Sequence, residues 1–182
     1  MNRNTASYLL ATLCALTLAA GCTTAPKSEE GKEKLEDRAA SAVAKAESED
    51  AGMTNLLNSA AGYAVFPRIG KGGAGVGGAY GHGVLYENGQ MVGYCDMTQA
   101  TVGAELGGQE YTEIVVLKTP EALQDFKKGH VKFDAQASAV ALKRGASENA
   151  KFHNGVAVFT FGEKGLMVEA SVGGQKFSYQ PK

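Results

Sequence analysis

The chain has 182 residues, 24 of them glycine, and a formal net charge of −1 at pH 7. This balance excludes the basic profile with which proteins bind nucleic acid or an anionic surface by charge alone. The length suits one domain with a sizeable core, and beyond the N-terminus no apolar run is long enough for a transmembrane helix.

Residues 1–21 have the layout of a bacterial secretory signal, because the apolar run Tyr8 to Ala20 is too short to span a bilayer comfortably. The small residues before Cys22 resemble the lipobox of bacterial lipoproteins, with Ala19 where leucine is commonest. This resemblance implies cleavage before Cys22 and acylation of that cysteine. Because Thr23 rather than Asp follows, it also implies an outer-membrane lipoprotein facing the periplasm of a Gram-negative cell. The alternative is an ordinary signal peptide whose last residue is a cysteine.

The three cysteines predict no internal disulfide. Cys14 leaves with the signal, Cys22 is consumed by lipid, and Cys95 remains alone. Each buried methylene of an acyl chain contributes roughly 0.8 kcal/mol, so several chains on one cysteine give lasting attachment. Cys95 lies in a strand-like run and is expected to be a small, buried apolar residue.

Residues 22–31 predict a flexible tether, because they are small and polar and include a proline. The next segment, 32–49, is rich in Ala, Glu and Lys, and its narrow apolar stripe predicts a helix that packs closely against the body. Its acidic polar face argues against a helix lying on a membrane. A second short helix is expected at 53–58, with Leu56 and Leu57 against the sheet.

The most unusual segment is the glycine-dense stretch 62–83, which begins with a strand-like run from Tyr63 to Phe66. Glycine at this density permits tight bends and close backbone approach. We therefore expect a curved, closely packed β segment, or a surface where a ligand lies against bare backbone. Gly73 to Gly78 fits the G-x-G-x-x-G dinucleotide pattern, but the strand and hairpin signals that follow it argue against a Rossmann site.

The rest of the chain predicts an α+β fold. Asn88-Gly89 favours a type I′ hairpin turn between strands at 83–87 and 90–96. Thr119-Pro120-Glu121 is typical of a helix start, and Gly129 of a helix end. Further strands are expected at 98–106 and 110–118, as a pair, and at 131–142, 155–161, 166–172 and 175–179. Together these elements predict a twisted antiparallel β-sheet or half-barrel with N-terminal helices and one inserted helix.

Several of these segments resemble the SYLF domain, over about residues 34–179 and most closely in its bacterial lipoprotein branch. The resemblance is carried by Ala64–Gly73, Gly75–Gly78, Thr101–Gly103, Leu106–Gly108 and Phe133–Ser138. It implies lipid binding, since eukaryotic relatives bind phosphoinositides and yeast-type members also bind actin filaments. It brings no catalytic residues. Those relatives use an amphipathic N-terminal segment and basic residues, so the acidic helix here argues against a phosphoinositide preference, and a bacterial envelope offers no actin.

Five residues are candidates for contact with lipid. Arg68 and Lys71 flank the glycine stretch, where backbone N–H groups can help to hold a phosphate, so they are candidates for the head group. The alternative is that both are solvated loop charges. Tyr63, Phe66 and Tyr80 are candidates for an acyl groove, and the alternative for them is core packing.

Catalytic motifs are absent from the sequence. His82, His130 and His153 are isolated and lack the spacing of metal ligands, so we expect them at the surface or satisfied by neighbours. The sequence therefore predicts a non-enzymatic protein without cofactor or metal, whose partner is phospholipid in addition to its covalent acyl anchor. The alternative function is a structural protein that bridges the outer membrane to another envelope component.

Overall fold

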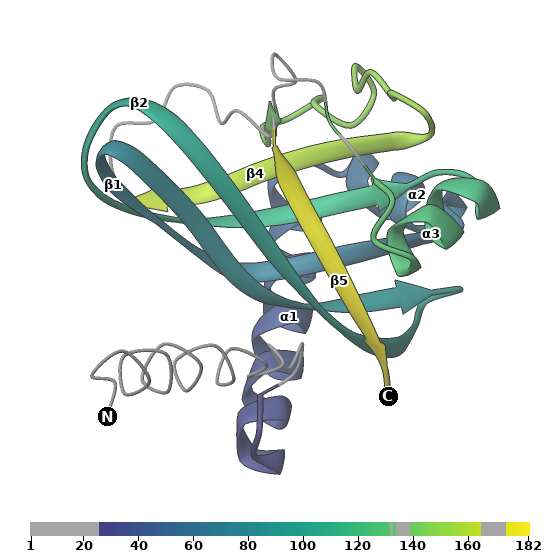
Figure 1. The fold of residues 1–182 in the computed structure, drawn as a ribbon. Coiled ribbons are helices and arrows are strands. Elements are labelled where there is room, and N and C mark those ends of the chain that lie inside the picture. Colours follow the sequence, from purple (N-terminus) through teal and green to yellow (C-terminus); the bar gives the residue numbers. More distant parts are fainter. Residues whose placement is uncertain (1–25, 132, 134–138, 165–173) are drawn as a thin grey trace, which may run out of the picture.

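The computed structural model describes residues 26–131, 133, 139–164 and 174–182 (Figure 1). The predicted signal, Cys22 and the first part of the predicted tether, residues 22–25, lie outside these ranges. The described elements are α1 (Glu29–Glu49), α2 (Gly52–Ser59), β1 (Gly62–Glu87), β2 (Gln90–Leu117), α3 (Pro120–Lys127), β3 (Val140–Ala141), β4 (Val156–Lys164) and β5 (Gln175–Pro181). The predicted α+β class is confirmed, since the strands form one mostly antiparallel sheet.

A long two-stranded ribbon of β1 and β2 dominates the sheet and curls back on itself (Figure 1). The predicted turn at Asn88-Gly89 joins the two strands, with φ angles of 51° and 75°. The predicted strand pair 98–106 and 110–118 is wrong, because both segments belong to β2 and pair with β1. Glycines face each other where the ribbon bends, at Gly72↔Gly108 and Gly73↔Gly107, so the ladder continues where the sequence indicated a break.

Close approach between the two halves of β1 requires glycine. A Cβ built on Gly83 would lie 2.6 Å from the carbonyl oxygen of Val65, and one on Gly81 would lie 2.9 Å from that of Arg68. Neither separation is open to a real side chain, so only bare backbone permits this contact. The prediction of a curved and closely packed β segment is therefore confirmed.

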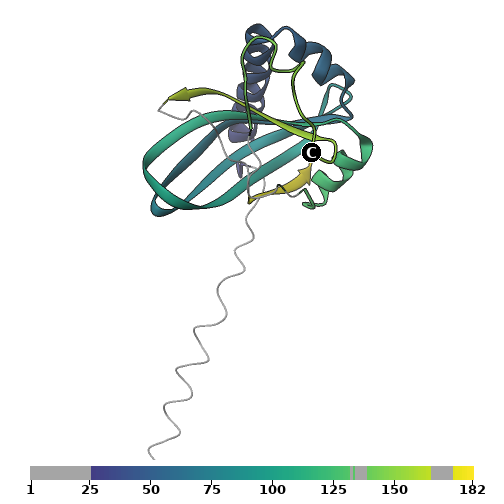
Figure 2. The ribbon, with the colours of Figure 1, turned by 90° about the horizontal axis from the view of Figure 1, so that it is seen from above.

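The sheet separates two layers of core, and Figure 2 shows α1 and α2 together on one side of it. On one side lies the α1-side core, which includes Leu35, Ala39, Ala46, Met53, Leu57, Val65, Val84, Tyr94, Ile114, Val116 and Phe159. On the other lies the α3-side core, which includes Ala64, Phe66, Ile69, Leu85, Cys95, Met97, Val115, Leu117, Leu123, Phe126, Val158 and Phe177. Cys95 is buried and free, as predicted.

The N-terminal helices match their predicted faces. The apolar stripe of α1 is buried, as expected, and Leu57 of α2 is buried, with Leu56 partly so. However, α1 begins at Glu29, inside the segment predicted as tether. The side chain of Ser28 explains this, because its Oγ accepts a hydrogen bond from the N–H of Gly31 at 3.1 Å and caps the helix.

The inserted helix α3 is confirmed with the predicted signals at both ends. Thr119 caps it by accepting a hydrogen bond from the N–H of Ala122 at 3.3 Å. Leu123 and Phe126 are its buried apolar pair, together with Ala122. Gly129 follows the helix with a φ of 70°, a conformation that favours glycine.

The C-terminal strands are confirmed in part. The predicted strands 155–161 and 175–179 are present as β4 and β5, which pair with opposite ends of β2. Of the predicted strand 131–142, the described residues include only the short β3, which runs parallel to β4. The predicted strand 166–172 lies outside the described residues. None of the described helices combines the length and the hydropathy needed to cross a bilayer.

Candidate functional site

Arg68 lies on a β-bulge of β1 that turns its side chain outward. The bulge falls between Phe66 and Ile69, and the hydroxyl of Thr112 stabilises it by donating to the carbonyl of Pro67 at 3.1 Å. The guanidinium contacts the carboxylate of Glu110 through Nε at 2.6 Å and Nη2 at 2.5 Å. The side chain of Arg68 is nevertheless 64% exposed, so an anion from solution can still reach it.

Lys71 has a different environment. It pairs with Gln109 in the same ladder, and only 9% of its surface is exposed. The two candidate head-group cations therefore do not form one exposed pair. Arg68 is accessible, whereas Lys71 is among the buried residues.

The three aromatic acyl-groove candidates lie in three separate places. Tyr63 stacks on Tyr86 with ring centroids 4.9 Å apart, and burial raises the pKa of Tyr63 to about 12. Phe66 is fully buried in the α3-side core, while Tyr80 is 46% exposed. Tyr63 lines a cavity of about 300 Å³ at the junction of α2 and the hairpin. The cavity residues are Leu57, Asn58, Ala60, Gly62, Tyr63, Asn88 and Gly89.

His82, one of the three isolated histidines, gains a partner that the sequence did not indicate. His82 contacts the buried carboxylate of Asp96 through Nδ1 at 2.6 Å, and the ring of Tyr80 lies edge-on to the imidazole at 5.0 Å. Burial raises the pKa of Asp96, although the hydrogen bond from His82 opposes this shift. Asp96 therefore holds the imidazole in one orientation on the sheet surface.

His130 and His153 line a second cavity, of about 270 Å³, beside α3. The residues that line it are Ala122, Asp125, His130, Val131, Phe133, His153, Asn154 and Val156. Across the described ranges, His, Cys, Asp and Glu side chains do not gather in a group of three or more that suits a metal ion.

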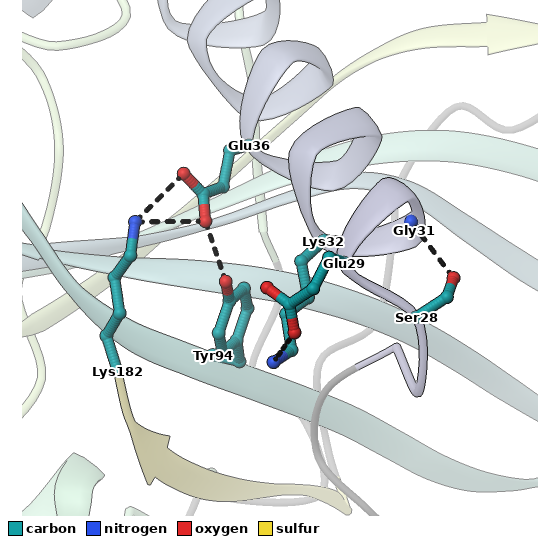
Figure 3. A network of polar contacts seen from close by, with 7 residues as sticks. All are labelled: Ser28, Glu29, Gly31, Lys32, Glu36, Tyr94 and Lys182. Atoms are coloured by element: carbon teal, nitrogen blue, oxygen red, sulfur yellow. Dashed lines mark hydrogen bonds and ion pairs between the residues drawn. The ribbon is translucent and has the colours of Figure 1, made fainter.

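A polar network fastens α1 to the sheet and to the C-terminal strand (Figure 3). The carboxylate of Glu36 accepts hydrogen bonds from the hydroxyl of Tyr94 at 2.7 Å and from Nζ of Lys182 at 3.1 Å. These contacts, that of Tyr94 first, lower the pKa of Glu36 despite its partial burial. The network therefore joins the N-terminal helix, β2 and the end of β5.

Replacing Tyr94 with phenylalanine is expected to lower the free energy of unfolding by about 1.5 kcal/mol, because a hydrogen bond to a charged group is lost. Urea denaturation measures this change. A double-mutant cycle with Glu36→Ala isolates the pair, and a coupling energy near zero would show that the contact contributes nothing.

Comparison with known proteins places the matched region in the second part of the chain. Residues 98–181 match the family described as "Ysc84: Las17-binding protein actin regulator". The chain is also 29% identical over 84 residues to beta cell expansion factor A of Aeromonas veronii. That match covers 46% of this chain and 32% of the relative, so it spans about a third of the relative's length. Glu110 lies inside the matched family region, whereas Arg68 and Lys71 lie outside it.

Proposed function

Since residues 98–181 match the Ysc84 (SYLF) family, we propose that this protein binds phospholipid and performs no chemistry on it. The family match is the observation that carries the proposal. It agrees with the resemblance seen at Thr101–Gly103 and Leu106–Gly108, which implies lipid as the ligand. In this proposal the protein is an envelope lipoprotein, held by acyl chains on Cys22 at the outer membrane and facing the periplasm.

The proposed anchor keeps the domain close to the bilayer. The segment from Cys22 to the start of α1 at Glu29 can extend over at most about 25 Å. The domain therefore meets lipid at a high effective concentration, and even a weak site is occupied. A modest, exposed contact is enough for such a function.

Arg68 is the residue proposed to meet the lipid phosphate. Its guanidinium is exposed, and its ion pair with Glu110 is solvated, so the pair holds it by only about 0–1 kcal/mol. A phosphate oxygen can therefore replace or join the carboxylate, with the planar donor fork that arginine offers. Lys71 is buried, so the proposal assigns the first contact to Arg68 and gives Lys71 no direct role.

Vesicle sedimentation tests this proposal. The chain from residue 22, carrying Cys22→Ser so that no acyl anchor contributes, is expected to bind anionic phospholipid vesicles at low salt. Arg68→Gln is expected to weaken the binding about five-fold, because one basic group near an anionic surface contributes about 1 kcal/mol.

Lys151→Gln is the matched control, since Lys151 is an exposed cation on the loop before β4. Its binding should equal that of the parent chain. Equal losses from both variants would indicate unspecific charge attraction, and absence of binding by the parent chain would overturn the proposal.

The protein-binding role in the description of the matched family favours a second candidate function. That role suits a structural or interaction protein that joins the outer membrane to another envelope component. This function predicts a specific protein partner in crosslinking, together with indifference to lipid composition in the sedimentation experiment.

A further inference from the structure

Glu113 is a carboxyl group completely enclosed by the fold. It lies on β2 with Phe66 of β1 as its partner on one side and Thr160 of β4 on the other. Its exposed fraction is 0%, and Gln175, its hydrogen-bond partner from β5, is 3% exposed. A charged carboxylate is costly in such a place, so the position requires a physical explanation.

The contact between Glu113 and Gln175 is half complete. Nε2 of Gln175 donates a hydrogen bond to Oε2 of Glu113 at 2.9 Å. The other oxygen of each group, Oε1 of Glu113 and Oε1 of Gln175, is buried without a hydrogen-bond partner. Both are acceptors when the carboxyl is ionised, so neither can satisfy the other.

One proton on Glu113 can provide hydrogen bonds for both unpartnered oxygens. A protonated Glu113 carries an O–H donor, and the unpartnered oxygen of Gln175 is an acceptor on the same pair of groups. Acid and amide can then exchange two hydrogen bonds, N–H to O and O–H to O. Burial raises the pKa of Glu113 to about 7, while the bond from Gln175 opposes the shift. The proton is therefore gained or lost near neutral pH.

The other titratable groups near Glu113 do not replace Gln175 as its hydrogen-bond partner. On its own face, Tyr111 lies two residues along β2, and Lys71 of β1 lies beyond Ile69 in the ladder. On β5 the exposed Lys176 alternates with the buried Gln175 and Phe177, which places it on the opposite face. On α3, Lys127 contacts Glu87, and Asp125 lines the second cavity.

The strand held by this contact covers the aromatic part of the α3-side core. Phe177, two residues after Gln175, has its ring centroid 5.0 Å from that of Phe126 and 5.8 Å from that of Phe66. β5 pairs only with β2 among the described strands. A change at Gln175 therefore acts directly on the strand that shields these rings.

We propose that Glu113 and Gln175 form a proton-dependent latch, which holds β5 over the aromatic core when Glu113 is protonated and loosens β5 when the proton leaves. Loss of the proton leaves a buried charge with a single hydrogen bond, and movement of β5 admits water to it. The loosened state exposes apolar surface near Phe66 and Phe126. That this surface receives acyl chains rests on the proposed function, whereas the latch itself does not.

Hydrogen exchange tests the latch in the full-length protein, purified with its own N-terminus in a mild detergent. The amides of β5 are expected to lose protection by about ten-fold or more between pH 5.5 and pH 8.5, after correction for the intrinsic rates. Amides of α1 in the same sample serve as the internal reference and should change little. Equal protection of β5 at both pH values would overturn the proposal.

The variant Glu113→Gln keeps an N–H donor at every pH, so its β5 amides should stay protected at pH 8.5. Loss of protection in this variant equal to that of the parent would also overturn the latch. Carbon NMR of the Glu113 carboxyl in the parent protein requires no variant. A carboxyl already ionised at pH 5.5 would exclude the mechanism. Because these readouts involve no lipid, a failed latch and a failed lipid-binding function are distinguishable.

Discussion

Replacing Gly83 with alanine is expected to lower the free energy of unfolding by about 3 kcal/mol. The added Cβ would lie 2.6 Å from the carbonyl oxygen of Val65 and 2.6 Å from Cδ1 of Phe66. Phe66 is fully buried, and the carbonyl belongs to β1 itself, so neither neighbour can move without separating the two halves of the strand. Overpacking of this kind costs about 1–3 kcal/mol. Urea denaturation with the slope fixed by the parent protein measures the change.

Gly70→Ala is the matched control in the same strand. A Cβ at Gly70 meets nothing within 4 Å, so this variant should remain within about 0.5 kcal/mol of the parent. Equal stability losses at Gly70 and Gly83 would show that the glycines serve general strand flexibility rather than the close contact within β1.

Replacing Asp50 with alanine is expected to destabilise the fold by about 4 kcal/mol. The carboxylate follows α1 and accepts three backbone hydrogen bonds, from Gly52 at 3.1 Å, Gly145 at 3.2 Å and Ser147 at 2.7 Å. Alanine leaves these donors without their acceptor, and each unsatisfied buried donor costs about 1–3 kcal/mol. Thermal or urea denaturation measures the loss.

Asp50→Asn is the companion variant, because its side-chain oxygen can still accept some of these bonds, and it should lose less stability than the alanine variant. Burial raises the pKa of Asp50, but the hydrogen bonds from Ser147, Gly145 and Gly52 outweigh it and lower the pKa. The contribution of the carboxylate is therefore present above the unfolded value of about 4 and is lost as the pH falls through the lower, folded value. A stability difference between parent and Asp50→Asn that persists unchanged in strong acid would contradict this account.

Local chemistry made several elements predictable from the sequence. The turn at Asn88-Gly89 requires two residues with positive φ, and the start of α3 requires a side-chain cap, which Thr119 supplies. Both signals lie within a few residues of the feature that they predict. The continuous ladder of the β1–β2 ribbon was not predictable. A pair of glycines can mark either a turn that ends a strand or a bend within a strand, and the sequence pattern is the same in both cases. Only the facing glycines on the other strand distinguish the two cases.

The candidate site was also predictable only where local sequence determines the structure. A plain two-residue hairpin would place His82 opposite Cys95, but the register shift near Leu85 and Tyr86 places it opposite Asp96. Arg68 and Lys71 looked like neighbours on a loop, whereas both lie within the continuous strand β1, where an odd spacing sends side chains to opposite faces. Register shifts and strand length depend on distant packing, which short sequence windows do not contain.

The contact between Lys182 and Glu36 bears on how the folded body carries mechanical load. Glu36 lies about 10 Å along the helix from Glu29, and the backbone N–H of Lys182 also donates to Val92 of β2 at 3.0 Å. Tension that enters through the N-terminal segment is thus shared between α1, β2 and the end of β5. Pulling α1 away from the sheet requires the hydrogen bonds of Glu36 to Tyr94 and to Lys182 to break together.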